Sequence, residues 1–536
     1  MLGRLTASWR EAGRAQRLYW LAMALSLLLG IFLRLNGYLG QRVSLWLDEA
    51  LWAPRFVDWP LLKLGIRPIG FVWLTRVLIN TFGATEIWLR FLPNLGALVS
   101  LALMPYVASR LLQTPALRVL LVLLFAIHPA LVDFANEFKP YSFEVLVHLV
   151  PIVLYLRYEQ TQRLGYLYAL LAYLPLGFLL AYNLAFAFPG ALLLCLLVAW
   201  RHPAKRRLLA VTVLGGALCA VTVGATYKLA LSTVTKQEKT ENYWGKKYDV
   251  FYRDAADDGE SRLGWTLSKH ADLAAMIGLR RQLWSDPGPL PERAAREIGT
   301  VDRWLWLVLS GAGLWALWRN ERRLLLLLAA PMLTLTLANL VGKWPLGAFR
   351  TNLFTAVYLF PLPLVGLELC RNQNRDLGRA LLGGVLACCV LPGFLFGFDW
   401  HGHKRTWTRD HYQREVIEKL YELRQRQLRE NPNLGRARLI LDLHTHESYD
   451  YYLGTHPEFR AKYREFFAKN FVRDNVGSNK VVSKAQQRLR AKEPVWVVVS
   501  KDSSTQAIDD FAKTKANVLL RERIRDEHVI LLLDTD

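Results

Sequence analysis

Long apolar segments, separated by short polar connections, dominate the chain. The first reads RLYWLAMALSLLLGIFLRL, over residues 17–35. Segments of about 18 to 22 apolar residues are long enough to cross the roughly 30 Å hydrocarbon core of a bilayer. The first is too long for a removable signal peptide and has no small-residue cleavage site. We predict about eleven transmembrane helices, near 17–35, 92–112, 117–133, 142–158, 164–182, 184–200, 207–231, 303–319, 322–341, 350–370 and 379–398.

The charges of the connections give the orientation of these helices. Cytoplasmic connections of membrane proteins are rich in Lys and Arg. Here alternate connections carry them: the N-terminus, 110–118, 157–163, 201–207, 319–323 and 371–379. The short connections on the other side carry few cations, chiefly Lys139, Lys343 and Arg350. We therefore place the N-terminus in the cytoplasm and expect a multi-pass protein of the inner (plasma) membrane.

Three hydrophilic regions then lie outside the cytoplasm: 36–91, 232–302 and 400–536. The last contains the apolar runs ARLILDLHT, EPVWVVVSKD and HVILLLDTD, which read as buried strands separated by helix-compatible segments at 411–430 and 505–515. The predicted fold is a polytopic α-helical membrane domain, residues 1–399, followed by a soluble extracytoplasmic α/β domain, residues 400–536. The external loops 36–91 and 232–302 belong to the first domain.

Composition narrows the choice of partner. A formal net charge of +22 would suit a protein that binds nucleic acid. Many of these cations, however, lie in connections that we place in the cytoplasm, where Lys and Arg are expected. We therefore expect membrane lipid, and not nucleic acid, as the partner. The five cysteines fall in or beside predicted spans and suggest neither disulfides nor a thiolate zinc site. His444, His446 and Glu447 lack the helical spacing of a zinc protease, and we expect the C-terminal domain to be an accessory module.

Polar residues gather at the outer ends of the spans. The orientation places three clusters on the same side, where they are expected to converge in one external cavity. They comprise Asp48 and Glu49 with Arg67; Asp133, Glu137, Lys139 and Tyr141; and Lys343 with Arg350. Each cluster also has an ordinary explanation, because acids at helix ends are often solvated and long cations extend to lipid head groups. Ionised groups at membrane depth nevertheless usually mark function.

The order of these motifs resembles that of the GT-C superfamily of membrane glycosyltransferases. The motifs are LDEA (47–50), RPIGFVWLTRVLINTFGATEIWLRFLPNL (67–95), HPALVDFANEFKPYSFEVL (128–146) and KWPLGAFRTNLFTAVYLFPL (343–362). The chain is similar to the branch that holds protein O-mannosyltransferases, the lipid A aminoarabinose transferase and sugar transferases of lipopolysaccharide cores. Many bacterial members have His-Pro-Pro where this chain has Arg67-Pro68-Ile69, so a histidine or metal role there does not carry over.

The resemblance implies a GT-C fold and an inverting glycosyl transfer. The donor would be a polyprenyl-phosphate sugar, either hexosyl or pentosyl, and the acceptor a hydroxyl on a glycan, lipid or protein of the cell envelope. The acid of the first external loop is the family's base, which carries onto Asp48 with Glu49 beside it. The cations Arg67, Lys139, Lys343 and Arg350, with Glu137 and Tyr141, would bind the substrates. A divalent metal ion remains open as a cofactor.

Two other classes of protein fit part of the pattern. A transporter or flippase of lipid-linked sugars would use acids and cations along a translocation path, but internal repeats and polar groups in mid-span are not evident. A scaffold or receptor would leave the acidic pair Asp48 and Glu49 unexplained. Glycosyl transfer explains both the acids and the cations, and it is the preferred interpretation.

Overall fold

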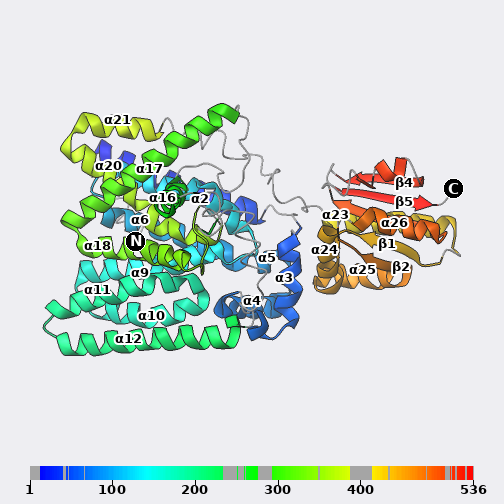
Figure 1. Cartoon of the computed structure of the whole chain (residues 1–536), viewed down its shortest axis with the longest axis horizontal. Helices are drawn as coiled ribbons and strands as arrows, with labels where there is room; N and C mark the ends of the chain where they lie inside the picture. Colours follow the sequence, from blue (N-terminus) through cyan, green and yellow to red (C-terminus); the bar gives the residue numbers. More distant parts are fainter. Residues whose placement is uncertain are drawn as a thin grey trace. The chain divides into compact units, whose positions relative to one another are not determined.

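The structure is a computed structural model of the whole chain, shown in Figure 1. It describes residues 13–39, 44–45, 47–64, 67–232, 250–251, 259, 261–275, 292–347, 350–386, 413–432, 435–477, 480–500, 507–508, 510–513, 516–524 and 528–534. By its internal contacts the chain forms two compact units. Unit 1 comprises Met1–Gly40, Gly65–Val72 and Arg90–Trp400; unit 2 comprises Gln41–Leu64, Trp73–Leu89 and His401–Asp536. The predicted division into 1–399 and 400–536 stays a prediction.

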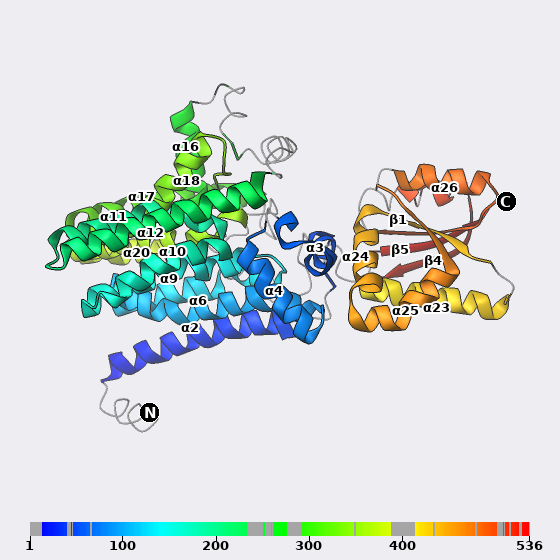
Figure 2. The ribbon, with the colours of Figure 1, turned by 90° about the horizontal axis from the view of Figure 1, so that it is seen from below.

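Unit 1 is a bundle of helices (Figures 1 and 2). Its elements are α2 (Arg14–Leu39), the first residues of α4 (Ile69–Phe82), α6 (Phe91–Leu111), α7 (Pro115–Ile127), α8 (Pro129–Asp133), η2 (Phe134–Asn136), α9 (Tyr141–Thr161), α10 (Gly165–Leu180), η3 (Tyr182–Ala187), α11 (Phe188–Arg201), α12 (Lys205–Thr226), η4 (Tyr227–Leu231), α16 (Arg262–Ala275), α17 (Glu292–Asn320), α18 (Arg322–Leu340), η5 (Arg350–Thr355), α19 (Ala356–Leu359), α20 (Pro361–Gln373) and α21 (Arg375–Val385).

The helices confirm a polytopic membrane protein. Among the described residues, 7 helices are long and apolar enough to cross a membrane, or 8 if the bent pair α7 and α8–η2 counts as one span. These correspond to eight of the predicted spans. The predicted span 164–182 is a shorter apolar helix, 303–319 lies within the longer α17, and 379–398 lies largely outside the described residues.

Two glycines allow an unusually close crossing between α17 and α20. A Cβ on Gly313 would lie 2.0 Å from the carbonyl oxygen of Leu362, and one on Gly366 would lie 2.0 Å from that of Leu309. Such contacts are impossible for any larger residue. Small residues at helix crossings let backbones approach within the membrane, where packing rather than the hydrophobic effect drives association.

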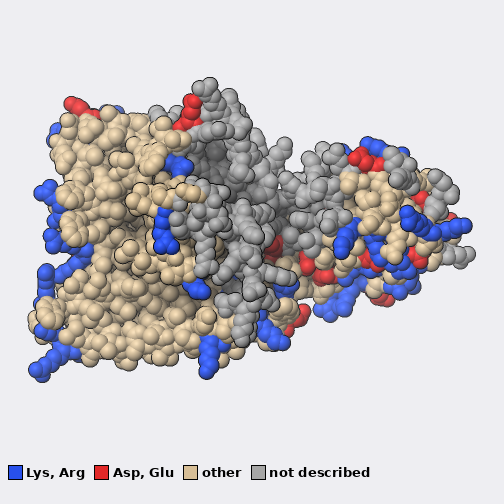
Figure 3. Space-filling model, viewed as in Figure 1, with Lys and Arg blue, Asp and Glu red and all other residues tan. Residues whose placement is uncertain are grey.

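Lys and Arg gather at one end of unit 1. On the face in Figure 3 most of unit 1 is uncharged, and Lys and Arg line one end. The connections between α11 and α12, between α17 and α18, and between α20 and α21 lie at that same end, at the left of Figure 1. The helices beside these connections carry Arg201 at the end of α11, Arg322 at the start of α18 and Arg371 in the last turn of α20. The orientation that would place this end in the cytoplasm stays a prediction.

Unit 2 combines helices of the segment 36–91, the first predicted external loop, with the C-terminal domain. The loop supplies α3 (Leu47–Asp58), η1 (Leu61–Leu64), most of α4 and α5 (Glu86–Leu89). The C-terminal domain contributes α23 (Gln413–Glu430), β1 (Ala437–Leu441), α24 (Leu443–Gly454), α25 (Pro457–Asn470), β2 (Phe471–Asn475), α26 (Val481–Arg490), β3 (Val495–Ser500), β4 (Asn517–Ile524) and β5 (His528–Asp534).

The C-terminal domain is a three-layer α/β/α structure, which confirms the predicted class. Its sheet has the order β2-β1-β3-β5-β4; β1 is parallel to β2 and β3, and β5 is antiparallel to β3 and β4. Helix α26 covers one face, while α23 and α25 lie on the other (Figure 2). The three predicted strands are β1, β3 and β5. Strands β2 and β4 were not predicted, because polar residues interrupt their sequences, FVRDN and NVLLRERI.

Candidate functional site

The acidic pair lies in the first turn of α3. Glu49 is fully buried and Asp48 is half-buried. Acids are favoured at this position because the N-terminus of a helix carries partial positive charge from its unpaired backbone N–H groups. At the other end of α3, the Arg76 guanidinium donates a 2.7 Å hydrogen bond to the carbonyl oxygen of Phe56. Helix α4 therefore fixes the direction of the helix that carries the acids.

The C-terminal domain holds the segment that leads into α3. The backbone N–H of Leu45 donates a 3.1 Å hydrogen bond to the hydroxyl of Tyr452 on α24, and the Ser44 hydroxyl accepts one of 3.1 Å from the backbone N–H of Arg414 on α23. Helices α24 and α3 pack against each other. The accessory role predicted for the C-terminal domain stays a prediction, but this domain holds the acid-bearing segment in place.

A buried carboxylate, Glu86 of α5, stands at the centre of the same contact. It accepts hydrogen bonds from the Tyr452 hydroxyl at 2.8 Å and from His456 Nε2 at 3.1 Å, and Arg414 Nε lies 3.6 Å away. His456 Nδ1 accepts from the backbone N–H of Phe459, so the ring carries its proton on Nε2, facing Glu86. Burial by itself would raise the pKa of Glu86, but these hydrogen bonds and the charge of Arg414 lower it to about 2.

In unit 1 the second predicted cluster forms the turn that leads into α9. Glu137 and Lys139 are almost completely buried, at 0% and 2% exposure, and Tyr141 opens α9 with its ring against Phe134. Asn136 anchors the turn through a 3.0 Å hydrogen bond from its amide to the carbonyl oxygen of Val132. Buried charges are retained only where partners compensate them. The role of Lys139 in substrate binding stays a prediction.

The third predicted cluster is divided. Arg350 begins η5, which packs against α8 and α9, the helices on either side of the turn that carries Glu137 and Lys139. The side chain of Asn352 shapes the loop before it, donating to the carbonyl oxygens of Pro345 and Gly347. Lys343, by contrast, is exposed and makes no hydrogen bond or ion pair through its side chain within the part of the chain that the structure describes.

Sequence reasoning missed a hydrogen-bonded chain inside unit 1. The Asn183 amide donates to Glu144 Oε2 at 2.8 Å, so its oxygen must accept from His148 Nε2 at 3.1 Å. His148 Nδ1 is then left to accept from the Tyr358 hydroxyl at 2.8 Å. All four side chains are buried. Glu144 and His148, two polar residues inside the predicted span 142–158, are the signal in the sequence that could have revealed this chain.

Arg67 belongs to the same region of unit 1. The positive charge of Arg67 lies close enough to attract the Glu144 carboxylate. Two residues later, the backbone N–H of Ile69 donates a 3.2 Å hydrogen bond to the Tyr182 hydroxyl. The structure thus associates the Arg67 segment with the second cluster through α9 and η3. The convergence of all three predicted clusters, which includes Asp48 and Glu49 of unit 2, stays a prediction.

Another buried cation in unit 1 has a structural role. Arg34 is fully buried and donates to the carbonyl oxygens of Gly30, Phe125 and Ala126. The last two lie at the end of α7, where the chain bends by 52° into α8 and its C-terminal carbonyls lack helical partners. Arg34 supplies those partners and stabilises the bend that precedes the Glu137 turn.

The described residues include no group of three or more His, Cys, Asp or Glu side chains arranged to hold a metal ion. In the C-terminal domain His446 Nε2 lies 3.2 Å from the Glu447 carboxylate, and the side chain of His444 lies outside the described residues. We assign no ligands for a divalent cation among the described residues.

Comparison with known protein families identifies one match. The model of the dolichyl-phosphate-mannose-protein mannosyltransferase family matches residues 66–225. This match confirms the resemblance to membrane glycosyltransferases of the GT-C superfamily. No curated protein matches the chain.

Similar solved structures include ArnT from Cupriavidus metallidurans, 13% identical, in the apo state (TM-score 0.48) and bound to undecaprenyl phosphate (TM-score 0.49). Each alignment covers 97% of this chain and 98% of ArnT. The archaeal oligosaccharyltransferase AglB from Archaeoglobus fulgidus, in complex with an inhibitory peptide and a dolichol-phosphate, is 13% identical, with a TM-score of 0.44 and coverage of 91% of this chain and 70% of AglB.

Proposed function

We propose that this protein transfers a sugar from a polyprenyl-phosphate donor to a hydroxyl acceptor at the extracytoplasmic face of the membrane, with inversion at the anomeric carbon. The observation that carries the proposal is the buried turn of Glu137 and Lys139 that leads into α9, the helix against which the Arg350 segment packs. The matching family acts, by its name, with dolichyl-phosphate mannose, which is a polyprenyl-phosphate sugar.

The cations serve the leaving group. As the bond between the anomeric carbon and the phosphate oxygen breaks, negative charge develops on the lipid phosphate, and fixed cations stabilise that charge most strongly where water is excluded. Lys139 is a point charge and Arg350 and Arg67 are planar, bidentate donors suited to phosphate oxygens. Glu137 and Tyr141, on either side of Lys139 in the chain, complete the proposed substrate-binding set. Exposed Lys343 contributes at the head-group level.

The acids serve the acceptor. An acceptor hydroxyl attacks the anomeric carbon from the face opposite the phosphate, and its proton passes to Asp48 as the new carbon–oxygen bond forms. The half-buried Asp48 is the more accessible of the two acids, while the fully buried Glu49 positions α3 and the acceptor. The products are the glycosylated acceptor and the polyprenyl phosphate.

Purified protein in nanodiscs, incubated with a panel of polyprenyl-phosphate hexoses and pentoses, tests this proposal. We expect release of polyprenyl phosphate from at least one donor, by transfer or slow hydrolysis. A transporter or flippase would instead move the intact lipid-linked sugar between leaflets. Movement without cleavage of any donor would overturn the proposal.

A further inference from the structure

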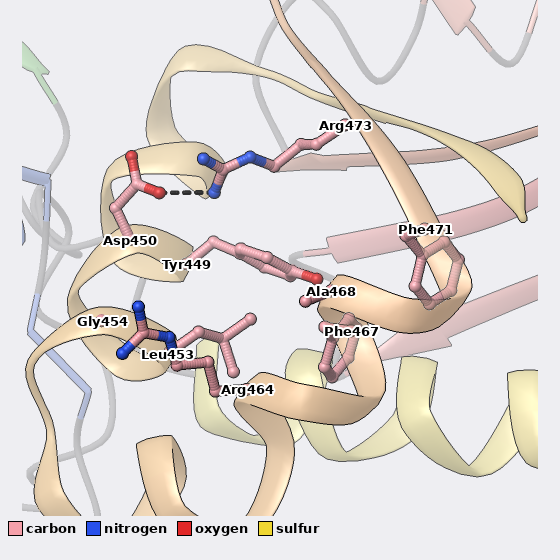
Figure 4. Close-up of a pocket in the computed structure, with 9 residues that line it drawn as sticks. All are labelled: Tyr449, Asp450, Leu453, Gly454, Arg464, Phe467, Ala468, Phe471 and Arg473. Atoms are coloured by element: carbon pink, nitrogen blue, oxygen red, sulfur yellow. Dashed lines mark hydrogen bonds and ion pairs between the residues drawn. The ribbon is translucent and has the colours of Figure 1, made fainter.

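The C-terminal domain contains a pocket of about 320 Å³ that the proposed reaction does not use (Figure 4). It lies between α24, α25 and the start of β2. Its volume is at the lower end of the roughly 300 to 1,000 Å³ of small-molecule sites. The lining residues are Tyr449, Asp450, Leu453, Gly454, Arg464, Phe467, Ala468, Phe471 and Arg473.

The floor of the pocket is apolar and rigid. Tyr449, Phe467 and Phe471 are each at most 5% exposed, and their rings pack in sequence, with centroids 5.2 Å apart between Tyr449 and Phe467 and 5.4 Å apart between Phe467 and Phe471. Leu453, one turn after Tyr449, continues this surface. A floor built from interlocked rings keeps its shape when a small molecule binds, which reduces the entropic cost of binding.

The rim of the pocket carries a net positive charge. Arg473 forms an ion pair with Asp450 and lies over the Tyr449 ring, 5.4 Å from its centroid. Arg464 is exposed and makes no hydrogen bond or ion pair with any residue that the structure describes. Asp450 therefore neutralises one of the two arginines and leaves the other available. An unpaired guanidinium beside an apolar floor suits a carboxylate or phosphate group attached to a ring-sized body.

We propose that this pocket binds one sugar unit that carries a negative charge, either a carboxylate or a phosphate. The C–H faces of the sugar would rest on the aromatic floor, its charged group would meet Arg464, and the Tyr449 hydroxyl, which makes no hydrogen bond within the described chain, would meet a sugar hydroxyl. The volume fits a single ring.

The pocket is separate from the contacts that hold the acid-bearing segment. Tyr449 and Leu453 of α24 line the pocket, whereas Tyr452, on another side of the same helix, bonds to Leu45 and Glu86. Substitution of the exposed Arg464 therefore leaves those contacts intact. The inference also stands apart from catalysis, because sugar binding can be measured without a donor.

The test is ligand-observed NMR titration of the full chain in detergent with galacturonic acid and glucose 6-phosphate as probes, and with uncharged galactose and glucose for comparison. We expect at least one charged probe to bind and the uncharged sugars to bind more weakly. Arg464→Gln should weaken binding of the charged probe by about tenfold, the loss expected for a charge-assisted hydrogen bond. Arg464→Lys should retain part of the affinity.

The variant Asp450→Asn separates a binding role of the rim from a structural role, because the two roles predict opposite changes in affinity. Without its ion pair Arg473 is released, so the charged probe should bind severalfold more tightly. Arg429→Gln, at an exposed position of α23 away from the pocket, should leave binding unchanged. Equal binding of charged and uncharged sugars, or unchanged affinity in Arg464→Gln, would overturn the proposal. Preference for one charged probe would identify the anionic group.

Discussion

Glu86 holds the first predicted external loop and the C-terminal domain together, and the substitution Glu86→Gln tests the strength of this contact. The side chain is 10% exposed, so solvent screens its interactions little. Lowering a pKa from 4.5 to about 2 corresponds, at about 1.4 kcal/mol for each pH unit, to about 3 kcal/mol of stability at neutral pH. A glutamine keeps the shape and one hydrogen bond, so we expect a loss of about 2 to 3 kcal/mol in unit 2.

Hydrogen exchange followed by mass spectrometry measures this loss in the elements concerned. If α3 and α24 open together, their amides should exchange about 30- to 100-fold faster in Glu86→Gln at pH 7. Glu458→Gln is a matched control, because Glu458 lies 3.9 Å from the same Arg414 but its side chain is 76% exposed. Wild-type protection in Glu86→Gln, or equal effects of the two variants, would refute the assigned role of Glu86.

The same pKa shift predicts how stability depends on pH. Because the folded pKa of Glu86 lies below the unfolded value, its contribution is fully present above pH 4.5 and is lost as pH falls toward 2. Thermal unfolding midpoints of wild type and Glu86→Gln should therefore differ most near neutral pH and converge on acidification. A difference that grows as pH falls would contradict the sign of the shift.

Three further predictions concern unit 1 and the orientation of the chain. Lys139→Ala should weaken use of the donor far more than it lowers expression, measured as donor binding and turnover; normal values for both would return Lys139 to a role at lipid head groups. Asn183→Ala should destabilise unit 1 by about 1 to 3 kcal/mol, because it leaves Glu144 and His148 buried without their shared partner. The control is Gln160→Ala, at the surface of α9, and an equal change in melting temperature in both variants would argue against this role of Asn183. Reporter fusions at Lys205 and Asp536 should give opposite signals, and matching signals would overturn the orientation.

The sequence predicted the membrane part well because long apolar segments carry their own signal. Span length depends only on local composition, and eight of the predicted spans correspond to described helices. The orientation inferred from Arg and Lys stays a prediction. The pairing between His148, Asn183 and Tyr358 was not accessible in this way, since these residues lie on three separate elements. Only the polar interruptions in the span 142–158 hinted at it.

The role of the C-terminal domain was also beyond the sequence. Tyr452 and His456 stand in a run of polar and aromatic residues that gives no sign of contact with Leu45 or Glu86, hundreds of residues earlier. The acid pair itself was visible because Asp48 and Glu49 follow directly on an apolar run. What could not be predicted is that one carboxylate would be fully buried and the other half-buried, because this depends on how α3 packs.

Turnover of Asp48→Asn is the measurement that tests the proposed reaction most directly. The substitution keeps the size of the side chain and removes the base, and general-base catalysis typically supplies about 10²- to 10⁴-fold in rate. With a donor that the wild type cleaves, in nanodiscs and at matched expression, turnover should fall by that order while donor affinity changes little, and Glu49→Gln should cost less. Transfer by Asp48→Asn at an undiminished rate would show that Asp48 is not the base.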